Sequence, residues 1–142
     1  MRKIFVSFLV VVLTLFGISS CSINDDGEEN FYFETLEVIN ADFPETFKQG
    51  DVYRIKVTFV RPTSCHFFEG FEFIKNDETE RTIFGVATAF SGNDCQNLDD
   101  GTIENFFDFE VLYSDTYTFK LWTGQNNNGE DEYLIIEVPV EE

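Results

Sequence analysis

The sequence predicts an all-β fold, an antiparallel β-sandwich of about seven strands, and three observations support this. No stretch after residue 30 shows sustained helical periodicity, whereas several segments alternate strictly between apolar and polar residues. Residues typical of turns separate these segments. Residues 21–142 also contain fifteen phenylalanines, and a single small sheet cannot bury so many, so two sheets must pack face to face. A small up-and-down β-barrel has the same strand signal and is the alternative.

Seven segments have the alternation expected of β-strands. In chain order they are residues 33–39, 53–59, 67–74, 82–90, 107–111, 117–122 and 134–140. The second is the clearest, because Ile55, Val57 and Phe59 share one side of a strand while Arg54 and Lys56 take the other. One polar side per strand is typical of antiparallel sheets with a solvated face. We therefore expect the phenylalanines to serve mainly as core packing.

The N-terminus has the features of a secretory signal. The first three residues include two bases, and residues 4–16 are almost wholly apolar, a run of signal-peptide length that is short for a lone membrane span. The Ile-Ser-Ser-Cys sequence at residues 18–21 resembles the lipobox of bacterial lipoproteins. The resemblance implies that residues 1–20 are removed and that Cys21 carries a diacylglyceryl thioether, with a further acyl chain such as palmitate on its amino group. An ordinary secretory signal with an incidental cysteine is the alternative.

The segment that follows, residues 21–30, is polar and acidic with one glycine, so we expect an unfolded tether. It resembles the acidic stretch after the lipidated cysteine in surface-exported lipoproteins of some Gram-negative bacteria. Aspartate beside that cysteine acts as a retention signal in other lineages, whereas position 22 here is Ser22. The resemblance implies a lipid-anchored protein of the cell outer membrane that faces the exterior, with the periplasmic face as the alternative. Residues 31–142 are then one folded domain.

The chain is strongly acidic, with a formal net charge of −18. Residues 1–20 contribute Arg2 and Lys3 and no acids, so residues 21–142 carry −20. A nucleic-acid binder needs clustered bases to neutralise phosphates, so nucleic acid is excluded as a partner. The same charge argues against electrostatic adsorption of the domain to anionic lipid. We expect the charge mainly to confer solubility, and a cationic partner or divalent cations are the alternative.

The C-terminal segment resembles the last hairpin of an immunoglobulin-like sandwich. Tyr117 begins an alternating stretch, a polar loop spans residues 124–132, and a second alternating stretch ends near Val140. In that fold a corner tyrosine often occupies the position of Tyr117, and its hydroxyl bonds back to the backbone. Residues 31–142 as a whole resemble small uncharacterised bacterial envelope lipoproteins with an immunoglobulin-like β-sandwich domain. This resemblance implies a fold and a location but no activity.

Two cysteines, Cys65 and Cys95, remain after Cys21. An even pair in an oxidising compartment predicts a disulfide, which would close a loop of about thirty residues. The alternative is a catalytic thiol with His66 as its base. Because neighbouring residues on a strand point to opposite faces, His66 is badly placed to serve Cys65, and we predict the disulfide.

The sequence predicts no catalytic site. His66 is the only histidine, which excludes zinc sites with several histidines, and neither a Gly-x-Ser-x-Gly elbow nor a glycine-rich phosphate loop is present. The acidic loop with Asp94, Asp99 and Asp100 is a weak candidate for structural calcium, as is the loop at residues 126–132. Neither has the spacing of an EF-hand, so plain turn chemistry is the favoured interpretation of both, and no other cofactor is expected.

The single tryptophan, Trp122, falls on the polar side of its predicted strand. Together with Lys120 and Thr118 it is a candidate contact for a protein or glycan, although a loop or a sheet edge covering the ring is an equal alternative. We therefore expect a non-enzymatic interaction module, attached to a membrane by its lipid, with a protein or glycan partner. The alternatives are a glycan-binding accessory module that uses Trp122, and an acidic inhibitor of a cationic enzyme.

Overall fold

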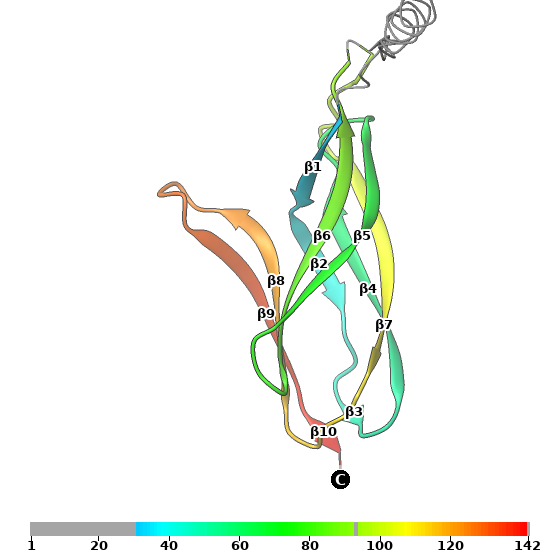
Figure 1. The fold of residues 1–142 in the computed structure, drawn as a ribbon, viewed down its shortest axis with the longest axis vertical. Coiled ribbons are helices and arrows are strands. Elements are labelled where there is room, and N and C mark those ends of the chain that lie inside the picture. Colours follow the sequence, from blue (N-terminus) through cyan, green and yellow to red (C-terminus); the bar gives the residue numbers. More distant parts are fainter. Residues whose placement is uncertain (1–30, 93, 142) are drawn as a thin grey trace, which may run out of the picture.

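The computed structural model describes residues 31–92 and 94–141, so the predicted signal peptide, Cys21 and the tether lie outside the described residues. The described chain forms an all-β sandwich that is not closed into a barrel, which confirms the predicted fold class (Figure 1). Seven of its strands have six or more residues, the number that the alternation predicts. No helix in these ranges is long and apolar enough to cross a membrane. The strands are β1 (Phe31–Leu36), β2 (Val38–Asp42), β3 (Phe47–Lys48), β4 (Val52–Val60), β5 (His66–Lys75), β6 (Glu80–Phe90), β7 (Thr102–Glu110), β8 (Tyr117–Gln125), β9 (Asp131–Val138) and β10 (Val140–Glu141).

The strands form two sheets and one short pair. In the five-stranded sheet, β5 pairs with one edge of β6. On the other edge of β6, residues 80–83 pair with β8 and residues 85–90 pair with β1. Strand β9 pairs with β8. The three-stranded sheet has the order β2-β4-β7 and is antiparallel. The short strands β3 and β10 pair with each other. The N-terminal strand changes sheets at Glu37, the single residue between β1 and β2.

Two of the pairings, β6 with β8 and β10 with β3, are parallel. The sequence led us to expect only antiparallel pairs. The difference arises from the connection between β6 and β8. Parallel neighbours need a crossover, and here β7, in the opposite sheet, provides it between β6 and β8. Alternation reveals which side of a strand is buried, but it carries no information about the direction of the neighbouring strand.

The core lies between the sheets and has the side chains that the alternation placed there. Ile55, Val57 and Phe59 from β4 are fully buried, and they meet Phe119 and Leu121 from β8. Opposite Phe59, β6 carries Gly85, and a Cβ atom at this position would collide with the Phe59 ring. The glycine therefore lets the two sheets approach closely at this point.

The expectation that phenylalanines pack mainly in the core is wrong for five of the fifteen. Four are buried (Phe47, Phe59, Phe107 and Phe119), but Phe31, Phe33, Phe67, Phe73 and Phe106 are between 46% and 67% exposed. Three of the exposed rings, Phe31, Phe33 and Phe67, lie on one face at one end of the five-stranded sheet, because Phe33 and Phe67 both pair with Thr88.

Tyr117 forms the corner that the sequence predicts. Its ring is buried, and its hydroxyl oxygen accepts hydrogen bonds from the backbone N–H groups of Leu112 and Tyr113 at 3.0 and 2.9 Å. These donors belong to the turn between β7 and β8. The tyrosine therefore fixes the connection by which the chain returns from the three-stranded sheet to the five-stranded sheet.

Candidate binding face of the five-stranded sheet

Aromatic and aliphatic side chains gather on the outer face of the five-stranded sheet. Because Leu121 and Leu134 pair with each other and face the core, the neighbouring pair Trp122 and Tyr133 faces outward. The Tyr133 ring lies edge-on to Phe84 of β6, with centroids 6.5 Å apart. Ile135, paired with Lys120, is 59% exposed. We call Phe84, Trp122, Tyr133 and Ile135 the tryptophan patch.

Trp122 is held in place by its polar edge. The indole N–H donates to Asp131 Oδ1 at 3.0 Å, and the side-chain amide of Gln125 donates to the same oxygen at 3.0 Å. Both bonds favour the ionised carboxylate, so the Trp122 bond and then the Gln125 bond hold the pKa of Asp131 below its usual value. The ring is half-buried. The exposure of Trp122 is therefore intermediate between the exposed ring and the covered ring that were the two alternatives.

A bulge in β8 sets the direction of the hairpin that carries Trp122. The register with β9 shifts between Trp122 and Gly124, and Gly124 has a φ of +115°, which a residue with a side chain rarely adopts. A Cβ atom there would lie 2.9 Å from Glu37 Oε1. Bulged strands bend, and beyond this point the β8–β9 hairpin curves away from the rest of the sandwich (Figure 1).

Lys120 and Thr118 share the outer face with Trp122, as the sequence predicted from their spacing. Lys120 Nζ lies 2.6 Å from Glu80 Oε1, so its charge already has a partner. The backbone N–H of Thr118 donates to the carbonyl of Thr79 at 2.9 Å. Their contact with a ligand stays a prediction, and the structure adds Phe84, Tyr133 and Ile135 to the candidate surface.

A second aromatic group lies at the end of this sheet where β1 begins. Phe31 contacts Phe33 and Phe90, with ring centroids 5.9 and 6.1 Å apart, and Phe67 contacts Phe90 at 5.8 Å. We call Phe31, Phe33, Phe67 and Phe90 the phenylalanine patch. This patch could not be predicted from the sequence, because apolar alternation in a strand does not say whether the apolar side faces the core.

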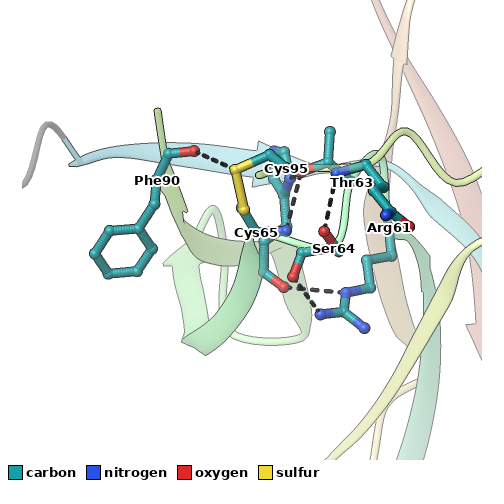
Figure 2. The surroundings of a disulfide bond; sticks show 8 residues. Arg61, Thr63, Ser64, Cys65, Phe90 and Cys95 are labelled. Carbon is teal, nitrogen blue, oxygen red and sulfur yellow. Dashed lines mark hydrogen bonds between the residues drawn. A yellow bond between two sulfur atoms is a disulfide. The ribbon is translucent and has the colours of Figure 1, made fainter. Parts of the chain in front are cut away.

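Cys65 and Cys95 form the predicted disulfide, with Cα atoms 5.4 Å apart (Figure 2). The bond joins the loop from β4 to β5 with the loop from β6 to β7, and backbone hydrogen bonds tie the same two loops together at Ser64 and Gln96. The Arg61 guanidinium donates to the carbonyls of Ser64 and His66 at 2.9 and 3.2 Å. The two loops that cross between the sheets are therefore fixed to each other.

His66 is a buried residue, 5% exposed, although it is the first residue of the edge strand β5. Thr63 Oγ1 accepts the N–H of Cys65 and lies 2.8 Å from His66 Nδ1, while His66 Nε2 lies 2.7 Å from Glu34 Oε2. All contacts are satisfied if Thr63 donates to Nδ1 and Nε2–H donates to the Glu34 carboxylate, and we assign this tautomer on that basis. The network links β1 to the disulfide loop.

The acidic residues proposed for calcium lie apart from this network. Asp94, Asp99 and Asp100 are exposed, and their loop is fixed by a bond from the Leu98 N–H to the Pro62 carbonyl. In the second loop, the Asn126 side chain accepts the N–H groups of Asn128 and Glu130 and so closes a turn. Across residues 31–92 and 94–141, no group of three or more His, Cys, Asp or Glu side chains is arranged to hold a metal ion. Calcium binding stays a prediction.

Comparisons of the chain with protein-family models, with curated proteins and with solved structures find no match.

Proposed function

We propose that the protein is a lipoprotein anchored to the outer membrane through Cys21, and that its sandwich is a non-enzymatic module that binds another macromolecule through the tryptophan patch. The observation that carries the binding proposal is the outward-facing group of Trp122, Tyr133, Phe84 and the 59% exposed Ile135. Large apolar side chains gathered on one face are typical of interaction sites, and tryptophan and tyrosine often dominate the affinity of such sites.

The polar groups around the tryptophan patch support recognition of a macromolecule. Bonding to Asp131 fixes the indole before a partner arrives, so little side-chain entropy is lost on binding. Lys120 and Glu80 supply a charged pair beside the aromatic rings. An apolar centre with a polar rim is the usual organisation of a protein interface.

The non-enzymatic part of the proposal rests on the surroundings of His66. Its two ring nitrogens are occupied by Thr63 and Glu34, and its side chain is 5% exposed. Thr63, His66 and Glu34 lie in the order of a nucleophile–base–carboxylate relay, but the Thr63 oxygen already accepts the Cys65 N–H. This bond and the burial of the imidazole favour a role in holding β1, because a catalytic base must reach its substrate.

The binding proposal is tested with two matched variants of the full lipidated protein. Trp122→Ser combined with Ile135→Ser removes the patch, whereas Phe106→Ser removes a 50% exposed ring from the outer face of β7. We expect cross-linked capture of a partner from envelope extracts to be lost with the first variant and retained with the second. Capture that survives the loss of the patch would place the binding site elsewhere.

The anchor is tested separately. The Cys21→Ala protein should take up no labelled palmitate and should leave the membrane fraction. A protein that stays membrane-bound, from a parent that takes up no palmitate, would contradict the lipoprotein proposal.

A glycan is the second candidate partner, and the chemistry around Trp122 favours it over a purely apolar ligand. The indole stands beside the carboxylate of Asp131 and the amide of Gln125, which are groups that can bond hydroxyls next to a stacking surface. A glycan array, read with and without calcium, distinguishes this ligand from a protein. Binding to the array that Trp122→Ser abolishes would favour the glycan.

A further inference from the structure

The first three residues of the described chain, Phe31, Tyr32 and Phe33, are all aromatic and are 54%, 50% and 67% exposed. Phe31 and Phe33 are on the outer side of β1, and they join Phe67 and Phe90 in the phenylalanine patch. Four rings in contact at one end of a sandwich form a surface that water solvates badly. This surface lies about 20 Å along β6 from Phe84 of the tryptophan patch, because Phe90 is six positions further along the strand than Phe84.

The length of chain ahead of this surface indicates what covers it. Cys21 is ten residues before Phe31, and a link of this length spans at most about 36 Å even when fully extended. A lipid on Cys21 therefore keeps β1 close to the bilayer. A short linker raises the effective concentration of a tethered surface into the millimolar range, at which a weak contact becomes populated.

We propose that the phenylalanine patch lies in the interfacial region of the phospholipid bilayer to which the protein is anchored. This inference rests on the lipid anchor of the proposed function. Aromatic rings beside a water-exposed backbone partition into the region between headgroups and acyl chains.

The charge of the protein identifies the kind of lipid. Residues 21–142 carry a net charge of −20, and Glu69, beside the patch, accepts a hydrogen bond from Thr88 at 2.6 Å. An anionic surface would repel such a domain, so the contact is apolar and is made with zwitterionic phospholipid. Arg61, whose guanidinium lies 5.9 Å from the centre of the Phe67 ring, supplies one positive charge at the rim for a lipid phosphate.

The experiment places a single indole in the patch. The full lipidated chain carrying Phe33→Trp and Trp122→Phe is inserted into phosphatidylcholine vesicles whose acyl chains are brominated near the headgroup. The matched control carries Phe106→Trp and Trp122→Phe, which places the indole on the outer face of β7 in the other sheet. We expect the emission of the indole at position 33 to shift to the blue and to be quenched by bromine. The indole at position 106 should show neither effect.

Flotation of the vesicles separates the two proposals. If the protein floats with the vesicles but bromine quenches the indole at position 33 no more than the one at 106, the bilayer contact is wrong and the anchor stands. If the protein does not float, the anchor itself fails and the bilayer contact fails with it. Replacing a third of the phosphatidylcholine with phosphatidylglycerol should weaken the quenching, and quenching that grows instead would overturn the assignment to zwitterionic lipid.

Discussion

The outer faces of the two sheets differ in chemistry, although both sheets bury their inner faces against the same core. The three-stranded sheet presents ion pairs: Arg54 Nε lies 3.9 Å from Asp108 Oδ1, and Lys56 Nζ lies 3.0 Å from Asp42 Oδ2. Its exposed ring, Phe106, lies under the Arg54 guanidinium. The five-stranded sheet instead presents the tryptophan and phenylalanine patches. A solvated face needs only polar side chains, so the apolar outer face is the one for which a partner has to be sought.

Removing the disulfide should have the largest effect on stability, because it joins the loops that lead from one sheet to the other. Cys65→Ser combined with Cys95→Ser should lower the free energy of unfolding by about 3–4 kcal/mol, from the entropy of a loop of this length. Chemical denaturation of the variant and the parent measures the difference. Equal stability of the two proteins would contradict this account of the disulfide.

A larger side chain at position 85 should push the two sheets apart. Gly85→Ala places a methyl group against the buried Phe59 ring, and overpacking of this kind costs about 1–3 kcal/mol. Phe59→Leu in the same chain should recover part of the loss, because it vacates the space. Denaturation of the single and double variants tests this, and strictly additive losses would show that the two residues do not contact each other.

Loss of the corner hydroxyl should have a smaller effect. Tyr117→Phe leaves the N–H groups of Leu112 and Tyr113 without their acceptor and should cost roughly 1–2 kcal/mol. Thermal unfolding measures the change, and hydrogen exchange at the two amides should accelerate. Unchanged exchange at both would contradict the corner geometry.

The ion pairs of the three-stranded sheet should contribute least to stability. Lys56 has a raised pKa, chiefly because it bonds to Asp42, but its side chain is 34% exposed, so water and salt screen the interaction. Lys56→Gln should lower the thermal midpoint less than Tyr117→Phe does, and the difference should vanish in molar salt. A large loss that persists in salt would show that this face has a structural role comparable to that of the core.

Acidification should change the fluorescence of Trp122 in the tryptophan patch. The pKa of Asp131 is lowered, so its bond to Trp122 is present at neutral pH and is lost only as the pH falls through that lowered value. Trp122 is the only tryptophan, so its emission should change only as the pH falls below the usual range of an aspartate carboxyl. Asp131→Asn should abolish this titration. An emission profile that is the same in both proteins would place another group beside the indole.

The fold was largely predictable from the sequence, because alternation reports burial directly. Ile55, Val57 and Phe59 alternate with polar neighbours and are buried as expected. Where both sides of a strand are apolar, as around Phe67 in β5, period two cannot tell the core side from the outer side. The burial of His66 was equally hidden, since it depends on Glu34, which is 32 residues away in a strand on the opposite side of β6.

The switch of the N-terminal strand from one sheet to the other also has a mechanical consequence. The six residues of β1 pair side by side with residues 85–90 of β6, and after Glu37 the chain continues as β2 in the opposite sheet. The hydrogen bonds of an antiparallel pair lie perpendicular to the strands. A pull on the chain ahead of Phe31, directed along the strand, therefore loads all the bonds of β1 in shear at once and does not open them one by one. A domain held at this end against flow or against a bound partner would resist force at its point of attachment.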